Sequence, residues 1–287
     1  MKLKREFIGK IICLVAFVEV FAVAAFGIGN RVAENREKEE ADAKPTVSET
    51  ATTKTTTTQP TTTAPPKRDL PKSTDKLVCF TFDDGPYAPV TNKILDTLEQ
   101  YDGRATFFVV GDRVKTYQNQ IKRAHEMGCE IGTHTYSHVN LTKLSVPEMQ
   151  KELKKSCDVI SSITGEEVKI LRPPEGATSE TVKANVGMPM VLWSVDSRDW
   201  EYRNADKDYD GVMNNVFDGS IVLMHDLYPA TAEAVAKLIP KLAAEGYKFV
   251  TFSELMEIRG IEVKPGEKYF SAKPIAPSAP SESSEAN

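Results

Sequence analysis

The sequence is too poor in cysteine for a disulfide-stapled fold. It has four cysteines among 287 residues, and Cys13 lies in a hydrophobic N-terminal run. The other three, Cys79, Cys129 and Cys157, cannot all pair with one another, and none belongs to a C-x-x-C motif. We therefore expect these cysteines to be small buried apolar residues rather than crosslinks.

The sequence also lacks a run of basic residues beyond its first few positions, and its formal net charge is -5. Because binding to phosphates requires concentrated positive charge, no nucleic-acid partner is expected. Hydrophobic residues make up 40% of the chain and charged residues 27%, which is ordinary for a globular protein with a real core. The length allows one sizeable domain with tails, or two small domains.

Residues 1–30 have the pattern of a membrane anchor. Four basic residues precede an apolar run from Ile11 to Gly29, which only Glu19 interrupts. A helix of this length reaches about 28 Å, close to the hydrocarbon thickness of a bilayer. The basic cluster predicts a single-pass protein of the cell membrane with an extracellular catalytic domain. The alternative is a secreted protein whose signal peptide is cleaved after Ala22-Val23-Ala24.

Three further segments follow the anchor. Residues 31–74 are first charged and then rich in Thr and Pro, which predicts a disordered stalk. Residues 261–287 are rich in Pro, Ser and Ala and predict a disordered C-terminal tail. Residues 75–260 form the expected folded domain, and a monomer is expected.

Within this domain, short runs rich in Val, Ile, Phe or Leu alternate with helical patterns, which predicts an α/β fold with a parallel sheet. About seven strand–helix units suit either a small barrel or a doubly wound sheet. The expected strands are Leu77–Phe82, Ala105–Val110, Glu130–His134, Val168–Arg172, Met190–Val195, Ser220–His225 and Lys248–Phe252. The expected helices include Val90–Tyr101, Arg113–Met127, Val146–Thr164 and Thr231–Glu245.

Reactive side chains follow the C-terminal ends of these strands, which is where parallel α/β folds build their sites. They are Asp83, Asp84, His134, His138, Arg172, Asp196, Asp199 and His225. The remaining histidine, His125, lies in a helical stretch, where an exposed surface position is expected.

The spacing of His134 and His138 places both rings on one face of a helical turn. Together with a carboxylate, two imidazoles suit a divalent transition metal. The adjacent Asp83 and Asp84 repel each other unless a cation or a proton relieves them. The alternative for this pair is a turn in which an Asp caps the next helix.

Three further segments have both a chemical and a structural interpretation. Arg172 begins a stiff Arg-Pro-Pro-Glu-Gly loop and can grip a carboxylate, or it can be a surface residue of a turn. Trp193 is expected in the core, and Trp200 lies beside Asp199. His225 ends an apolar strand, where a partly buried histidine is the structural alternative.

Five segments, in order and with fitting spacing, resemble the polysaccharide deacetylases that carry a NodB-homology domain, carbohydrate esterase family four. The resemblance covers about residues 76–258 and extends to bacterial peptidoglycan N-acetylglucosamine deacetylases. The five segments are Thr81-Phe82-Asp83-Asp84-Gly85-Pro86, His134-Thr135-Tyr136-Ser137-His138, Arg172-Pro173-Pro174-Glu175-Gly176, Asp196 to Trp200, and Leu223-Met224-His225.

The resemblance implies a distorted (β/α) barrel and one divalent metal ion, zinc or else cobalt or manganese. It implies that Asp84, His134 and His138 bind this ion. It further implies that Asp83 is the general base oriented by Arg172, that His225 is the general acid paired with Asp199, and that Trp200 and Leu223 line an acetyl pocket.

One residue departs from the pattern of the family. Glu175 stands where an aromatic residue, commonly Tyr, is usual. In the family the backbone N–H at this position helps to form the oxyanion hole. The substitution therefore affects the expected substrate preference more than the expected reaction.

The resemblance implies a metal-dependent hydrolase that removes N-acetyl groups from a cell-wall polysaccharide, with N-acetylglucosamine of peptidoglycan as the leading substrate. Alternatives are an O-acetyl esterase on a xylan-type polymer and a chitooligosaccharide deacetylase. Outside enzymes, the alternatives are a carbohydrate-binding module with a degenerate site and a stalked structural protein.

Overall fold

The computed structural model describes residues 68–274. The predicted anchor at 1–30 and most of the predicted stalk lie outside the described residues. Within residues 68–274, no helix is long and apolar enough to cross a membrane.

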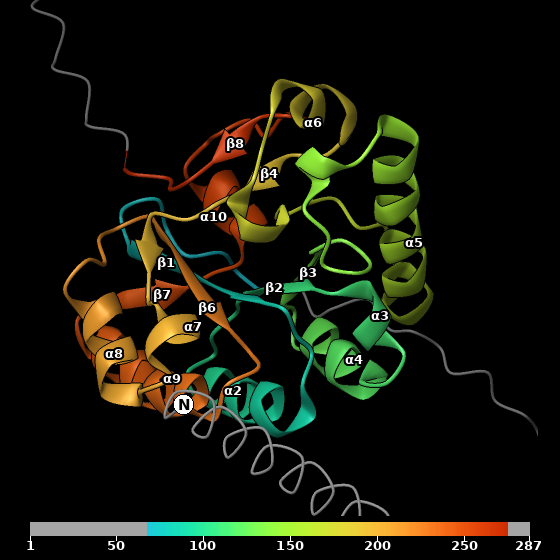
Figure 1. Ribbon diagram of the computed structural model, residues 1–287. Helices are drawn as coiled ribbons and strands as arrows, with labels where there is room; N and C mark the ends of the chain where they lie inside the picture. Colours follow the sequence, from blue (N-terminus) through green and yellow to red (C-terminus); the bar gives the residue numbers. More distant parts are fainter. Residues whose placement is uncertain (1–67, 275–287) are drawn as a thin grey trace, which may run out of the picture. The chain divides into compact units, whose positions relative to one another are not determined.

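A parallel sheet forms the centre of the described domain (Figure 1). Its strands run in the order β3-β2-β1-β6-β5, and β7 pairs with the first part of β1. Every pairing between these strands is parallel, so the predicted α/β fold with a parallel sheet is confirmed. The strands are β1 (Lys76–Asp83), β2 (Thr106–Val109), β3 (Glu130–Thr133), β5 (Val195–Asp196), β6 (Ser220–His225) and β7 (Tyr247–Phe249).

Single bridges continue the pairing beyond β3. Leu171 pairs in parallel with Thr133 on one side and with Met190 on the other. Residues 190–196 then contain β4 (Met190–Val191) at their start and β5 at their end, and β5 pairs with β6. Strand pairing therefore runs from β6 through β1, β2 and β3, and across Leu171 to β4. The chain then continues from β4 to β5, which pairs with β6 again.

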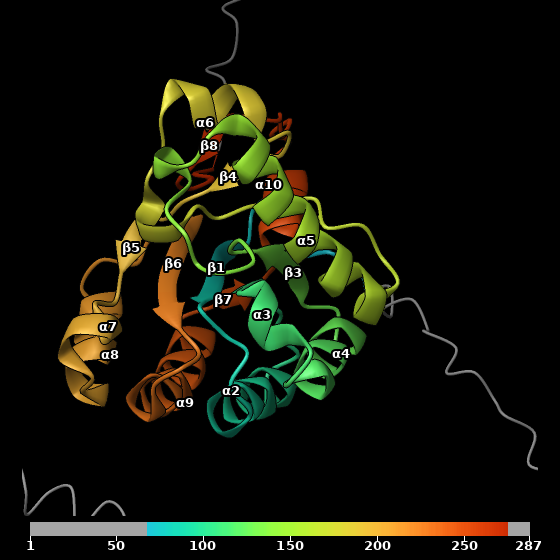
Figure 2. The same ribbon diagram turned by 45° about the vertical axis from the view of Figure 1, so that its right-hand side comes forward.

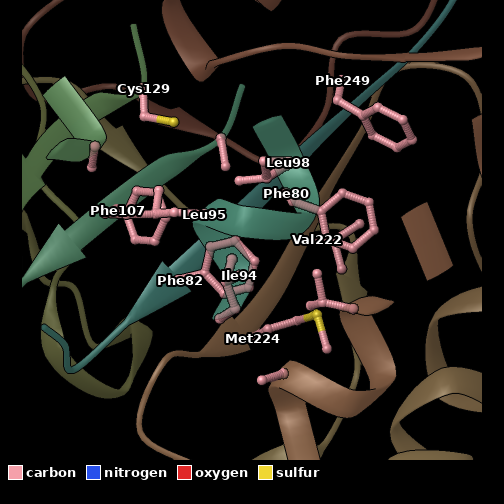
Figure 3. Packing of buried hydrophobic residues seen from close by; sticks show 14 of the residues in the cluster. Phe80, Phe82, Ile94, Leu95, Leu98, Phe107, Cys129, Val222, Met224 and Phe249 are labelled. Atoms are coloured by element: carbon pink, nitrogen blue, oxygen red, sulfur yellow. The ribbon is translucent and has the colours of Figure 1, made fainter. Parts of the chain in front are cut away.

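Side chains of β1 alternate between the two faces of the sheet. Phe80 and Phe82 pack in the larger apolar cluster, among residues of helices α2 (Ala88–Gln100) and α9 (Pro229–Ala244). Figure 3 shows these rings beside Ile94, Leu95 and Leu98 of α2. Cys79 faces the other way, in a second cluster with Phe108, Ile170, Val191 and Ile221. This period of two directs Asp83 to the same side as Cys79.

The helices surround the sheet, and α2, α8 and α9 lie side by side along one flank (Figures 1 and 2). The longest, α5 (Val146–Thr164), matches its predicted bounds, because a Ser145/Glu148 capping box begins it and Gly165 in a left-handed conformation ends it. The others are α3 (Gly111–Val114), α4 (Gln118–Glu126), α6 (Glu180–Asn185), α7 (Asp199–Tyr202), α8 (Ala205–Met213) and α10 (Phe252–Ile258), with 3-10 turns η1 (Leu141–Lys143) and η2 (Pro174–Gly176).

Three expected elements differ from the structure. The expected strand Val168–Arg172 is reduced to the bridges of Leu171, since two prolines follow and supply no N–H donors. The expected strand Met190–Val195 divides into β4 and β5, because its two ends pair with different neighbours. The expected helix Arg113–Met127 divides into α3 and α4.

The domain is longer than the predicted 75–260 at both ends. Arg68, expected in the stalk, forms a salt bridge of 2.9 Å with Glu254 and donates to the Phe249 carbonyl. Part of the expected C-terminal tail forms β8 (Lys268–Tyr269), which pairs with β4, and Ala272 is buried. The sequence did not indicate these contacts because neither segment has an apolar period.

Candidate active site

The site begins with a buried pair, Asp83 and Arg172, at the end of β1. Arg172 is fully buried, and its Nη1 donates to Asp83 Oδ1 at 2.8 Å and to Thr81 Oγ1 at 2.7 Å. Its other guanidinium nitrogens donate to the carbonyls of Val191 and Leu192 at 2.8 Å. The guanidinium therefore has a fixed position, and it fixes one oxygen of the Asp83 carboxylate.

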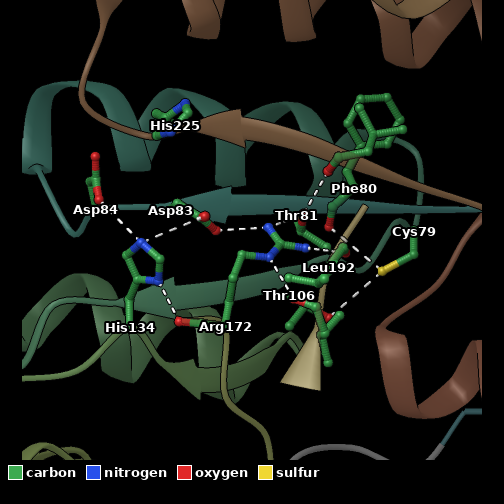
Figure 4. Close-up of polar contacts among 12 residues, drawn as sticks. Cys79, Phe80, Thr81, Asp83, Asp84, Thr106, His134, Arg172, Leu192 and His225 are labelled. Carbon is green, nitrogen blue, oxygen red and sulfur yellow. Dashed lines mark hydrogen bonds and ion pairs between the residues drawn. The ribbon is translucent and has the colours of Figure 1, made fainter. Parts of the chain in front are cut away.

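Three side chains beside this pair converge on one point. Nε2 of His138 lies 3.1 Å, and Nε2 of His134 lies 3.5 Å, from Oδ1 of Asp84. One ligand atom from each of the three residues lies within 4.8 Å of the others. The other ring nitrogen of His134 is 2.7 Å from the Arg172 carbonyl, which orients the imidazole. Figure 4 shows His134 between Asp84 and Asp83.

The expected helical turn from His134 to His138 is wrong, although the two rings do converge. Residues 134–138 form a loop, in which Thr135 and His138 have φ angles of 67° and 55°. The backbone N–H groups of Tyr136 and Ser137 donate to the Glu152 carboxylate of α5. Hydrogen bonds to α5, rather than a helical repeat, therefore shape this loop.

The chemistry of the three ligands fits a divalent transition metal. Asp84 Oδ1 is buried and faces the Nε2 atoms of both imidazoles. Burial alone would raise the pKa of Asp84, but the nearby imidazoles outweigh it and lower this pKa to about 2. Burial lowers the pKa of His134, which favours the neutral imidazole that a metal requires. The hydrogen bond and charge of Asp84 raise the pKa of His138.

A second pair, the partly buried His225 and the buried Asp199, lies on the other side of Asp83. The strand register sets His225 directly beside Asp83, because β6 and β1 are neighbours. His225 Nδ1 lies 2.7 Å from Asp199 Oδ1, and Thr231 Oγ1 donates to Asp199 Oδ2 at 2.7 Å. Burial alone would lower the pKa of His225, but Asp199 outweighs it and raises this pKa to about 9. This raised pKa favours the protonated imidazole.

A cavity of about 350 Å³ connects these groups. Eight of the ten site residues expected from the sequence line it, and Arg172 and Asp199 lie behind Asp83 and His225. The complete lining is Asp83, Asp84, His134, His138, Glu175, Gly176, Trp193, Asp196, Trp200, Leu223 and His225.

Glu175 lies exposed at the rim of this cavity. Its backbone is left-handed, with a φ of 61°, and its Oε2 accepts a hydrogen bond of 2.7 Å from Asn140. Asn140 is two residues beyond His138, so this bond links the Arg-Pro-Pro-Glu-Gly loop to the loop that carries the metal ligands.

Comparison with known proteins agrees with this geometry. The family model for polysaccharide deacetylase matches residues 70–191. Over 194 residues, the chain is 41% identical to the peptidoglycan-N-acetylmuramic acid deacetylase PdaC of Bacillus subtilis, covering 68% of this chain and 42% of that protein. It is 34% identical over 195 residues to a peptidoglycan-N-acetylglucosamine deacetylase of Bacillus cereus, covering 65% of this chain and 91% of that one.

The chain belongs to the polysaccharide deacetylase family.

A solved structure of the family also matches the fold of this chain. The family 4 acetyl xylan esterase of Clostridium thermocellum, in complex with a cobalt ion, matches with a TM-score of 0.65 at 37% identity, covering 68% of this chain and 98% of that chain. The chain covers less than half the length of PdaC, so the family assignment applies to the shared domain.

Asp226 lies behind the turn that carries Asp84, a position that the sequence did not indicate. This residue is fully buried and accepts a hydrogen bond of 2.5 Å from Thr91 at the start of α2. A Cβ added to Gly85 would lie 2.0 Å from Asp226 Oδ1, so the turn after Asp84 packs directly on this carboxyl group. Burial raises the pKa of Asp226 to about 7. Its position next to His225 in the chain was the available signal.

Two other residues differ from their expected environment. Trp193, expected in the core, is only partly buried and lines the cavity, because the segment between β4 and β5 runs along its wall. His125, expected on an exposed helix face, is buried with 5% of its surface accessible, because α4 turns that face toward the domain. His125 is absent from the lining of the active-site cavity.

Proposed function

We propose that this chain is a metal-dependent deacetylase that hydrolyses N-acetyl groups of a cell-wall polysaccharide, with N-acetylglucosamine of peptidoglycan as its substrate. The observation that carries this proposal is the register of β1 and β6, which sets Asp83 and His225 side by side next to the three candidate metal ligands. A base, an acid and a cation site within one cavity suit the hydrolysis of an acyl group.

In this proposal Asp83 is the general base. Its Oδ1 is held by Arg172, and its Oδ2 lies 3.7 Å from His134 Nε2, beside the cation site. The free lone pairs of Oδ2 can accept the proton of a water that attacks the acetyl carbon. Arg172 prevents the carboxylate from rotating away during this transfer.

His225 is the general acid. Asp199 occupies Nδ1, so the proton available for transfer is the one on Nε2. The leaving sugar nitrogen must be protonated as its bond to the acetyl carbon breaks, because an amine anion is too poor a leaving group. A protonated His225 supplies this proton, and the charge of Asp199 keeps the imidazole protonated until then.

Asp84, His134 and His138 would hold the cation, for which we propose zinc, with cobalt or manganese as substitutes. When bound, the cation supplies Lewis acidity, which polarises an acetyl carbonyl and acidifies water. The backbone N–H of Glu175 would donate to the developing oxyanion, an interaction typically worth about 3 kcal/mol. Trp200 and Leu223 would line the pocket for the acetyl methyl group.

We also propose that the closed pairing of strands is a distorted (β/α) barrel, and that the domain acts as a monomer. The N-terminal residues 1–30 would hold it at the cell membrane with the catalytic domain outside. The apolar run from Ile11 to Gly29 supports this location.

An O-acetyl esterase is the second candidate, and the similarity to an acetyl xylan esterase favours it. Acetate release from N-acetylglucosamine oligomers, from peptidoglycan and from acetylated xylan separates the two activities. Faster release from the amide substrates supports the proposed function, and release from xylan alone would replace it with the esterase. Tight binding without acetate release would indicate a binding module.

A further inference from the structure

Beside the active-site cavity, two cationic side chains lie over tyrosine rings. The Arg203 guanidinium carbon is 4.7 Å from the ring centre of Tyr228, and the Lys207 ammonium nitrogen is 5.0 Å from that of Tyr202. We call these four residues the cationic strip. Arg203 and Lys207 are exposed, and Tyr202 has 38% of its surface accessible, so the strip is open to a large ligand.

One end of the cationic strip lies beside His225, the proposed general acid. The Tyr228 ring centre lies 6.1 Å from that of His225, which lines the cavity. Tyr202 ends α7, the short helix that begins with Asp199 and also carries Trp200. Trp200 lines the cavity as well and is 47% exposed. A sugar chain that leaves the cavity past His225 and Trp200 would reach the strip.

The two cations of the strip form no salt bridge with a carboxylate of residues 68–274, whereas their neighbours do. Arg198 pairs with Glu201, and Lys237 pairs with Asp206 at 2.6 Å. The positive charge of Arg203 and Lys207 is thus available to a ligand. The anionic Glu175 comes from a separate segment, η2, and bonds to Asn140 instead.

We propose that the cationic strip is a subsite for a sugar that bears a carboxylate and that follows the reacting N-acetyl sugar in the polymer. The tyrosine rings hold the two cations in place, because a guanidinium or ammonium group is attracted to the face of an aromatic ring, and Arg198 also lies 5.1 Å from the Tyr202 ring centre. Arg203 can bind a carboxylate through two parallel hydrogen bonds, and Lys207 adds a second positive charge. The substrate class is therefore an anionic glycan rather than a neutral chitin-like or xylan-like chain. This proposal rests on the proposed function.

The test compares two tetrasaccharides with the full-length, metal-loaded protein. One contains only N-acetylglucosamine and is neutral; the other alternates N-acetylglucosamine with a sugar that carries a lactyl carboxylate. The measured quantity is the ratio of kcat/KM for acetate release, anionic over neutral substrate. In Arg203→Gln/Lys207→Gln we expect this ratio to fall about fivefold, since two exposed charges each contribute a small favourable free energy.

Two further variants separate charge at the strip from other effects. Lys151→Gln/Lys154→Gln removes the same total charge from exposed positions on α5 and should leave the ratio unchanged. Arg203→Lys retains the charge without the planar donors and should lower the ratio less than the double variant does. The wild-type ratio should also fall as the salt rises from roughly 0.05 M to roughly 0.5 M, because exposed charges are screened.

An equal ratio in the wild type and in Arg203→Gln/Lys207→Gln would overturn the subsite. An equal fall of this ratio in Lys151→Gln/Lys154→Gln would also overturn it. Failure of the proposed function has a different signature, in which the wild type releases no acetate from either tetrasaccharide.

Discussion

The Asp199 carboxylate holds His225 at two points. Its Oδ1 lies 2.7 Å from Nδ1 of the imidazole, and its Oδ2 accepts the backbone N–H of the same residue at 2.7 Å. The strand end and the ring are therefore fixed by one buried side chain, which leaves Nε2 as the free ring nitrogen. The roles proposed for both residues depend on this arrangement.

Replacing His225 with Ala should harm amide substrates more than ester substrates. An amine leaving group needs a proton, whereas an alkoxide can leave with less assistance. We expect kcat for N-acetyl substrates to fall at least about a hundredfold, with a smaller loss on O-acetyl esters. Acetate release from both substrate types measures this, and equal losses would contradict the assignment of His225 as the acid.

The raised pKa of His225, about 9, predicts how activity depends on pH. The acid must be protonated, so kcat on amide substrates should be retained below about pH 9 and fall above it. In Asp199→Asn the negative charge is lost and burial remains, so the pKa should fall and the alkaline limb should move to lower pH. An alkaline limb at the same pH in both proteins would show that another group sets it.

Removing Arg172 should strongly destabilise the fold. In Arg172→Met the Asp83 carboxylate stays buried without its partner, which typically costs about 3 kcal/mol or more in the free energy of unfolding. The double variant Asp83→Asn/Arg172→Met should be less destabilised, because it leaves no unpaired buried charge. Denaturant unfolding measures both, and a mild loss in the single variant would contradict the buried pair.

Gly85→Ala should weaken metal binding. The new Cβ would overlap Asp226, so the turn that carries Asp84 would have to move away from His134 and His138. We expect the metal affinity to fall about tenfold or more. Gly187→Ala is a suitable control, because its Cβ would meet no atom within 4 Å, and its positive φ of 66° makes it a strained substitution as well. Equal metal affinity in Gly85→Ala and wild type would show that the turn tolerates displacement.

The sequence predicted the site better than it predicted the backbone that carries it. Strand ends can be found from apolar runs and alternation, and this located Asp83 and His225 without knowledge of their partners. The loop from His134 to His138 could not be found in this way, because its shape comes from hydrogen bonds to Glu152, which is distant in the chain.

Pairing and packing between distant segments explain the other differences. The strand expected at Val168–Arg172 depends on partners at Thr133 and Met190, and both of them bridge this segment at the single residue Leu171. Asp226 was missed because it packs against Gly85, and no spacing in the sequence indicates this contact.

The most direct test of the account is acetate release by the purified protein on N-acetylglucosamine oligomers and on peptidoglycan, after chelation and again after zinc, cobalt or manganese is added. We expect no release after chelation, recovery with metal, and a loss of at least about a hundredfold in Asp83→Asn with its fold intact. Release that persists in the chelated protein, or that Asp83→Asn retains in full, would contradict the account.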